Sequence, residues 1–140
     1  MISVSETVDL QAPAAEVWKT VGNFGAAASY LEVVDRCELQ GNPPGAERVL
    51  HLKGGGSVLE RLILASESDK AFRYTIVDSP LPVSDYVSTV RVDALDPRRC
   101  RVTWSASFES HGASDAEAKA TIAGIYRMGF DGLKKLHDPS

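Results

Sequence analysis

Apolar and polar positions alternate along most of this chain, as they do in strands that bury one face. In residues 2–10, for example, Ile2 and Val4 alternate with Ser3 and Ser5. Comparable segments recur further on, separated by the turn signals GNPPG, GGG, ESDK, SPLP and DPRR. Most of these connections are short, so the strands should pair with their sequence neighbours in an antiparallel meander. We predict strands over residues 2–10, 33–40, 46–53, 57–67, 71–78, 84–94 and 99–109.

The stretch after the first strand has helical periodicity instead. Pro13 suits the first turn of a helix, and Val17, Trp18 and Val21 then form a short apolar face. The glycines that follow should end this helix. A second short helix is predicted over residues 26–31.

A long helix is predicted over residues 115–136. It begins with Ser114 and Glu117, which have the spacing of a capping box. It also contains glycines, each of which costs about 1 kcal/mol relative to alanine in a helix interior. Two explanations are open: the glycines let the helix approach its neighbours closely, or they leave room for a ligand. These glycines are Gly124, Gly129 and Gly132.

Together the elements predict a single α+β domain over residues 1–140, with two short helices after the first strand. Both the sheet and the long helix must bury an apolar face. A strongly curved, seven-stranded antiparallel sheet wrapped around the C-terminal helix satisfies both requirements. We find no internal repeat or linker that would divide the chain.

Composition excludes several classes of function. The chain has 140 residues and a formal charge of −4 without a basic block, so we expect no nucleic-acid partner. It shows neither a signal-peptide pattern nor the roughly 20 apolar residues of a membrane span, which predicts a cytoplasmic protein without integral membrane contact. Cys37 and Cys100 are expected to be reduced thiols. The histidines lie far apart in the sequence, and we expect no metal and no organic cofactor.

The order of these elements and several local sequences resemble a known superfamily. The matching stretches are APAAEVWKTVGNF in the first helix, VLERLILASES, FRYTIVDSPLPVSDY, and GFDGLKKL in the final helix. They resemble the START/Bet v 1-like (SRPBCC) superfamily and, within it, the bacterial polyketide cyclase/dehydrase-like branch. The resemblance covers essentially the whole chain. It implies a helix-grip fold with an apolar cavity between sheet and helix, and it favours the ligand explanation of the glycines.

Alternation alone does not decide which face of residues 57–67 lines such a cavity, because both faces are largely apolar. The resemblance decides it: plant hormone receptors of the superfamily have a cavity-facing glutamate in the matching Glu-Arg-Leu. Glu60 should therefore face inward and Arg61 outward. The same alternation assigns the other strands. The predicted ligand-binding residues are Arg48, Leu50, Val58, Glu60, Leu62, Tyr74, Ile76, Val83, Tyr86, Ser88, Trp104 and Phe108, with Gly124 and Met128 from the helix.

A buried carboxylate at Glu60 needs a partner. If Gly54 to Gly56 form the hairpin turn, Leu50 lies opposite Glu60, and Arg48 is within diagonal reach on the same face. An Arg48–Glu60 ion pair is therefore predicted. Two roles are open for it: a buried structural salt bridge, or a pair that orients a ligand or performs acid–base chemistry.

Further expectations concern the long helix, one strand start and one loop. Tyr126 and Arg127 should lie at the edge and on the solvent side of the long helix. Asp85 should point outward at the start of its strand. The segment SPLPVSDY, residues 79–86, either lines the cavity mouth, as the loop at this position does in the resembled receptors, or is a plain turn.

Three functions remain open at this point. The first is binding of a small hydrophobic or amphipathic molecule, such as a lipid, polyketide or aromatic metabolite, in the cavity. The second is a cyclase/dehydratase-like enzyme in which Glu60 is the general acid or base and Tyr86 stabilises a developing oxyanion. The third is a protein-interaction module with a vestigial cavity. The sequence also leaves open whether the protein is a monomer or a homodimer.

Overall fold

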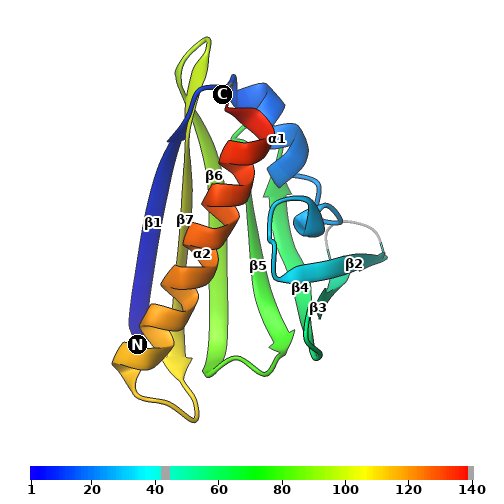
Figure 1. Ribbon diagram of the computed structural model, residues 1–140, viewed down its shortest axis with the longest axis vertical. Helices are drawn as coiled ribbons and strands as arrows, with labels where there is room; N and C mark the ends of the chain where they lie inside the picture. Colours follow the sequence, from blue (N-terminus) through cyan, green and yellow to red (C-terminus); the bar gives the residue numbers. More distant parts are fainter. Residues whose placement is uncertain (42–44, 139–140) are drawn as a thin grey trace.

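The computed structural model describes residues 1–41 and 45–138. Its elements follow the predicted order (Figure 1). The predicted turn at residues 42–44 and the predicted stop at Pro139 lie outside the described residues. The elements are β1 (Ile2–Leu10), α1 (Ala14–Val21), the short 3-10 helix η1 (Ala27–Ser29), β2 (Val34–Gln40), β3 (Glu47–Leu52), β4 (Ser57–Ser66), β5 (Ala71–Asp78), β6 (Val83–Asp96), β7 (Arg99–Ser110) and α2 (Asp115–His137).

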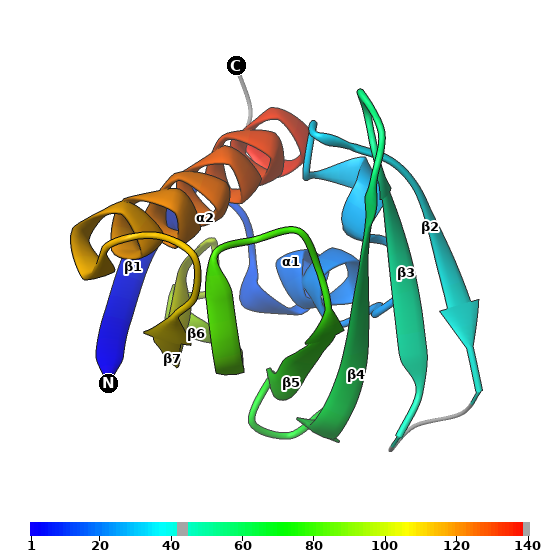
Figure 2. The same ribbon diagram turned by 90° about the horizontal axis from the view of Figure 1, so that it is seen from below.

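The strands form one seven-stranded antiparallel sheet in the order β1-β7-β6-β5-β4-β3-β2. The first strand therefore pairs with the last, and the others form the predicted meander. The sheet is strongly curved, and α1, η1 and α2 lie on its concave side (Figures 1 and 2). This is the α+β helix-grip architecture that the sequence predicted, because each layer buries its apolar face against the other.

Helix α2 starts where the capping box predicts. The Glu117 backbone N–H donates to Ser114 Oγ at 3.1 Å, and Ser114 Oγ donates to Glu117 Oε1, also at 3.1 Å. The first bond satisfies a backbone donor that the first turn of a helix would otherwise leave free, and the second holds the two side chains together. One stripe of the helix is then buried against the rest of the protein: Ala118, Ile122, Ala123, Tyr126, Gly129, Phe130 and Leu133.

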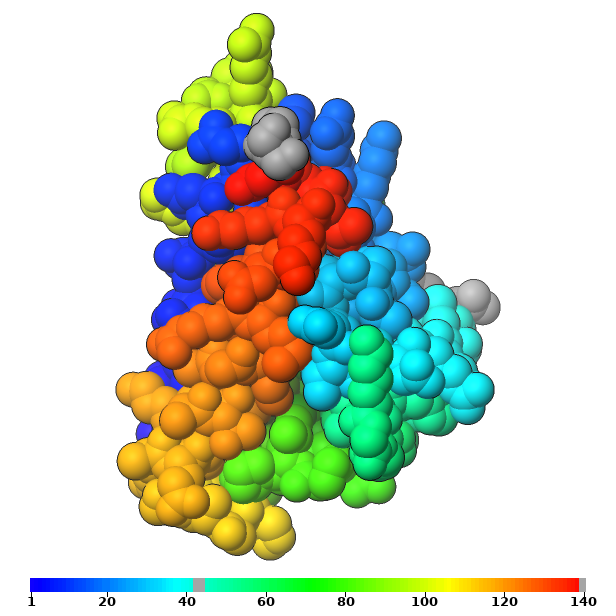
Figure 3. Space-filling model, in the orientation of Figure 1, coloured from blue at the N-terminus to red at the C-terminus, as the bar shows by residue number. Residues whose placement is uncertain are grey.

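Two of the three α2 glycines allow close packing of the helix. A Cβ at Gly132 would lie 1.8 Å from the Tyr30 carbonyl oxygen, and one at Gly129 would lie 2.7 Å from the Trp104 ring. At Gly124 an added Cβ would meet nothing within 4 Å. On the surface shown in Figure 3, the orange and red helix contacts the light-blue segment that includes η1. Close approach therefore explains Gly129 and Gly132, whereas it does not explain Gly124.

The β3–β4 hairpin differs from its predicted register by two residues. Arg48 pairs directly with Glu60, and Leu50 faces Val58 instead of Glu60. The reason is that the turn is centred on Gly54 instead of Gly55, and the Leu52 backbone N–H donates to the Gly56 carbonyl oxygen at 3.0 Å. Those glycines all have positive φ, the conformation that glycine adopts most easily. In the observed register Arg48 and Glu60 lie directly opposite each other, which is closer than the predicted diagonal arrangement.

A bulge at the start of β6 decides which of its residues face inward. Strict alternation cannot put Val83 and Tyr86 on the same face, because they are three residues apart. The register shifts between Ser84 and Val87, and Asp85 has a φ of 51°. This extra residue lets Val83 pack against the core while Tyr86 is buried, and Asp85 is exposed as predicted.

Two simpler expectations concern the thiols and the membrane. Cys100 is buried, Cys37 is half-buried, and both are free thiols as predicted. Within the part of the chain that the structure describes, neither α1 nor α2 is long and apolar enough to cross a membrane.

Candidate functional site

A cavity of about 240 Å³ lies between the concave face of the sheet and α2. Strands β3, β4 and β5 supply most of the sheet side, and α2 closes the opposite side. The segment after η1 and one residue of the SPLP connection complete the wall. The lining is Leu31, Val33, Val34, Arg48, Leu50, Leu52, Val58, Glu60, Tyr74, Ile76, Leu81, Tyr86, Trp104, Thr121, Ile122, Ile125, Tyr126 and Met128.

Most of the residues predicted from the sequence to bind ligand lie in this wall: Arg48, Leu50, Val58, Glu60, Tyr74, Ile76, Tyr86, Trp104 and Met128. Others do not reach it. Leu62, Ser88 and Phe108 are buried in the surrounding core, and Val83 is half-buried against that core. Strand alternation therefore predicted which face of the sheet lines the cavity, but it did not predict how far the cavity extends along that face.

Gly124 does not line this cavity, although it was predicted there as a ligand-binding residue. The residue is exposed and borders a wide surface depression of about 800 Å³, together with Arg127 and Asp131. It follows the cavity-lining Ile122 by two residues, which is a rotation of roughly 200° about the helix axis. Gly124 therefore points away from the sheet.

Tyr126 is the residue that sequence reasoning misplaced most. It was expected at the edge of α2, but it is 1% exposed and lies in the cavity wall. A signal was available, because Tyr126 stands four residues after Ile122 and three before Gly129, at the spacing of one helix face. Arg127 is exposed, as predicted.

Other lining residues were not predicted: Leu31, Val33, Val34, Leu52, Leu81, Thr121, Ile122 and Ile125. Residues 31–33 connect η1 to β2 through irregular backbone, where neither periodicity assigns a face. Leu81 belongs to SPLPVSDY, for which a role at the cavity mouth was one of two expectations. Its place in the wall favours that role.

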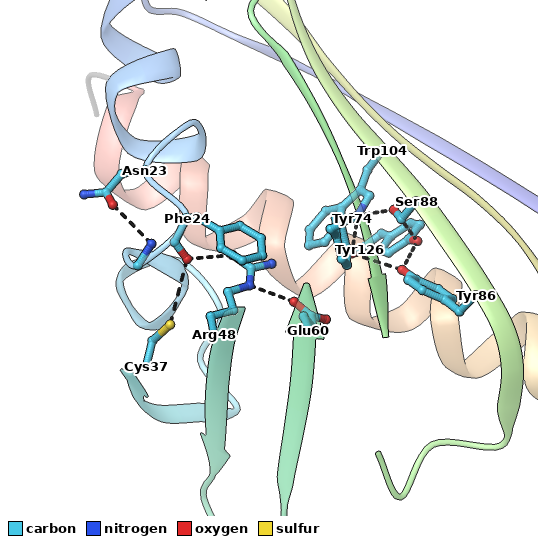
Figure 4. Close-up of polar contacts among 11 residues, drawn as sticks. Asn23, Phe24, Cys37, Arg48, Glu60, Tyr74, Tyr86, Ser88, Trp104 and Tyr126 are labelled. Carbon is cyan, nitrogen blue, oxygen red and sulfur yellow. Dashed lines mark hydrogen bonds and ion pairs between the residues drawn. The ribbon is translucent and has the colours of Figure 1, made fainter. Parts of the chain in front are cut away.

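Arg48 and Glu60 form a buried ion pair beside the cavity (Figure 4). Arg48 Nε donates to Glu60 Oε1 at 2.7 Å, and Arg48 Nη1 donates to the Phe24 carbonyl oxygen at 3.0 Å. The guanidinium also lies 4.1 Å from the centre of the Phe24 ring, a favourable cation–π distance. Segments from β3, β4 and the loop after α1 are thus fixed to one charged group.

The second oxygen of Glu60 is available to the cavity. The hydrogen bond to Arg48 uses Oε1, and among the described residues no buried side-chain oxygen is left without a partner. Oε2 forms no hydrogen bond there, so it must keep some open surface, and Glu60 lines the cavity. Burial raises the pKa of the Glu60 carboxyl, and the charge of Arg48 opposes part of that rise.

Aromatic hydroxyls form the second polar group of the wall (Figure 4). Tyr86 Oη lies 3.0 Å from Tyr74 Oη and is also hydrogen-bonded to Tyr126 Oη. Tyr126 Oη is 3.1 Å from Ser88 Oγ. Trp104 Nε1 is 3.1 Å from both Tyr74 Oη and Ser88 Oγ. Side chains from β5, β6, β7 and α2 therefore share one continuous network.

Packing keeps these aromatic groups in place and uncharged. The Trp104 and Tyr126 rings stack with centroids 4.3 Å apart and an angle of 14° between planes. Burial raises the pKa values of Tyr74 and Tyr86 well above the ordinary value of a tyrosine, and it raises the pKa of Tyr126 as well. The phenols are therefore neutral hydroxyls near neutral pH, able both to donate and to accept a hydrogen bond.

Buried polarity is concentrated at this one place. Apart from the aromatic residues, the buried polar side chains of residues 1–41 and 45–138 are Arg48, Glu60 and Ser88. Two of them line the cavity, and the third bonds to residues that do. The same described residues contain no group of three or more His, Cys, Asp or Glu that could hold a metal ion. The polar groups of this apolar cavity can form hydrogen bonds and exchange protons with a bound molecule.

The family described as polyketide cyclase/dehydrase and lipid transport matches residues 1–138. The chain belongs to this family. The assignment confirms the resemblance seen in the sequence and covers every element described above. No protein with a curated description matches the chain by sequence.

Solved structures of other proteins have the same architecture. XoxI from Bacillus cereus is 25% identical with a TM-score of 0.92, covering 98% of this chain and 96% of its own. A protein from Thermobifida fusca is 30% identical with a TM-score of 0.87, covering 100% and 99%. The Zhui aromatase/cyclase from Streptomyces sp. R1128 is 17% identical with a TM-score of 0.75, covering 94% and 87%. At that identity the last comparison shows the fold alone.

Proposed function

We propose that this family member binds a small, largely apolar molecule in the cavity between the sheet and α2. The observation that carries the proposal is the cavity itself: an apolar enclosure with its polar groups gathered on part of the wall. Family membership supports it, because the family is described by polyketide chemistry and lipid transport. The Zhui protein, an aromatase/cyclase by name, has the same fold.

The volume limits the ligand. A space of 240 Å³ corresponds to about eight water molecules at their share of liquid volume. One or two aromatic rings, or a short aliphatic chain, match this size. A two-chain lipid or a polyketide of several fused rings would require the wall to open. The proposal therefore favours an aromatic metabolite or a short polyketide among the expected ligand classes.

A matched pair of substitutions on β5 tests the proposal. Ile76 lines the cavity, and its neighbour Val77 is exposed and does not line it. Ile76→Trp should fill the space, whereas Val77→Trp adds the same side chain outside it. We expect native mass spectrometry of freshly purified wild type and Val77→Trp to show a bound mass that organic extraction releases, and Ile76→Trp to lack it.

Added 2-naphthol gives the same test for protein that purifies empty. We expect calorimetry to detect binding to wild type and Val77→Trp but not to Ile76→Trp. Equal binding by all three proteins would place the ligand elsewhere, and the absence of any binding to wild type would overturn the proposal.

One observation also favours the enzymatic alternative. The carboxylate of Glu60 reaches an apolar cavity next to neutral tyrosines, an arrangement suited to proton transfer. If the bound compound is a substrate, Glu60→Gln should still bind it but lose turnover by about a hundredfold or more. Retained turnover would exclude Glu60 as the acid or base and leave the binding role.

A further inference from the structure

We propose that the cavity takes up an aromatic or short-chain carboxylic acid together with one proton, which the ligand carboxyl group and Glu60 then share. This rests on the proposed binding function and names a ligand class for it. The shared proton lets an acid that is an anion in water enter an apolar enclosure without adding net charge. Two features of the wall support the proposal: the open atoms of the Arg48–Glu60 pair and the balanced charge of the lining.

The Arg48–Glu60 pair leaves one donor and one acceptor open to the cavity. Arg48 donates through Nε and Nη1, whereas its Nη2 forms no hydrogen bond with a described residue. Glu60 accepts through Oε1, and its Oε2 has no partner among those residues either. No buried side-chain nitrogen or oxygen of the described residues lacks a partner, so both atoms keep some open surface, and both residues line the cavity. A neutral carboxyl group matches the pair, because its carbonyl oxygen accepts and its hydroxyl donates.

The lining carries no net charge. Of the described residues in the wall, Arg48 and Glu60 are charged, and their charges cancel in the ion pair. None of the described histidines lines the cavity. The other titratable groups around the pair are neutral near neutral pH, because burial raises the pKa values of Tyr30 after η1, Cys37 on β2, Tyr74 on β5, Tyr86 on β6 and Tyr126 on α2. A bound carboxylate would therefore leave one uncompensated negative charge in the site.

Two carboxylates in one buried site do not both stay ionised, because each raises the pKa of the other. Burial already raises the pKa of the Glu60 carboxyl, and the charge of Arg48 opposes part of that rise. A ligand carboxylate beside Glu60 adds a like charge and raises this pKa further. One proton from solvent then bridges the ligand and Glu60 Oε2, while the second ligand oxygen accepts from Arg48 Nη2. The proton returns to solvent when the ligand leaves.

2-Naphthoate and 2-naphthamide test the proton uptake by titration calorimetry from about pH 6 to about pH 8. The amide has nearly the same shape and offers an acceptor and a donor without titrating. We expect the affinity of wild type for 2-naphthoate to fall about tenfold per unit of rising pH, since one proton binds with it, and that for 2-naphthamide to stay constant. The binding enthalpy of 2-naphthoate in phosphate and in Tris should differ by the ionisation enthalpy of one buffer proton.

The outcomes separate the two proposals. A constant affinity for 2-naphthoate, an equal slope for acid and amide, or failure of 2-naphthoate to bind where 2-naphthamide or 2-naphthol binds would overturn the shared proton and leave cavity binding intact. Failure of all three compounds to bind would overturn both.

Glu60→Gln tests where the proton is held. In this variant the carboxylate of 2-naphthoate can pair directly with the charge of Arg48. We expect the pH dependence to disappear, and the affinity at about pH 8 to exceed that of wild type about tenfold or more. Glu47→Gln is the matched control and should keep the wild-type slope, because Glu47 pairs with Arg61 at 2.8 Å and does not line the cavity. A tenfold slope in folded Glu60→Gln would contradict the proposal, and the wild-type series decides it even where this variant does not fold.

Discussion

Helix α2 meets the rest of the protein in two different ways. At Gly129 and Gly132 the helix backbone comes so close to Trp104 and Tyr30 that no Cβ fits. One to two turns earlier, Ile122 and neighbouring large side chains face a cavity. One helix therefore combines a tight contact with an open space.

This difference argues against the interpretation that the glycines make room for a ligand. Missing side chains do not create the space; they allow the tight contact, which holds α2 against η1. Tyr126 and Ile125 stand between the helix axis and the cavity and form part of its wall. The tight contact fixes the position of the helix, and a fixed helix can keep a cavity open where side chains do not meet.

Gly132→Ala should have the largest effect, because it breaks the tight contact. The new Cβ would overlap the Tyr30 backbone, which cannot move as a side-chain tip can. We expect a loss of at least about 4 kcal/mol in the free energy of unfolding, or failure to fold. Urea denaturation followed by circular dichroism measures this loss. A midpoint equal to that of wild type would show that η1 does not pack on α2 in this way.

Arg48→Met should have the next largest effect, because it removes a partner from the cavity wall. It leaves the buried Glu60 carboxylate uncompensated, which costs about 3–4 kcal/mol near neutral pH. The double variant Arg48→Met/Glu60→Leu should regain much of this loss, since no buried charge remains. A double variant as unstable as the single one would show that Arg48 acts through its contacts with Phe24 instead.

The pH dependence of Arg48→Met provides a second check. Burial already raises the folded-state pKa of Glu60, and loss of Arg48 removes the charge that opposes this rise. A carboxyl with a raised folded-state pKa stabilises the fold below its unfolded pKa and loses that contribution as the pH rises through the folded pKa. The variant should therefore regain stability relative to wild type as the pH falls from neutral toward about 4.5. A constant difference across this range would contradict the assignment to Glu60.

Gly124→Ala should have the smallest effect and the opposite sign. An added Cβ at this position meets open space on an exposed face of the helix. Alanine should stabilise the protein by about 0.5–1 kcal/mol through helix propensity alone. The same urea experiment serves as the matched control for Gly132→Ala. A destabilising result would mean that this face of α2 is covered in solution.

The sequence predicted the architecture well because alternation, turn signals and the capping box each act locally. The Arg48–Glu60 pair was also predictable, although the turn length and hence the register were not. The Tyr126 contacts could not be found locally, since they join α2 to β6 across 40 residues of sequence. The bulge at Asp85 likewise depends on a backbone irregularity that alternation does not encode. Long-range packing decided which predicted residues reach the cavity.

The two tryptophans allow the central claim to be measured directly. Trp104 Nε1 belongs to the cavity network, whereas Trp18 Nε1 donates to Glu67 Oε2 at 2.8 Å and does not line the cavity. Nitrogen-15 NMR spectra recorded during titration with 2-naphthol report both indole N–H groups at once. The account predicts that the Trp104 signal shifts and saturates while the Trp18 signal stays in place. An unmoved Trp104 signal, or equal shifts of both, would contradict ligand binding in this cavity.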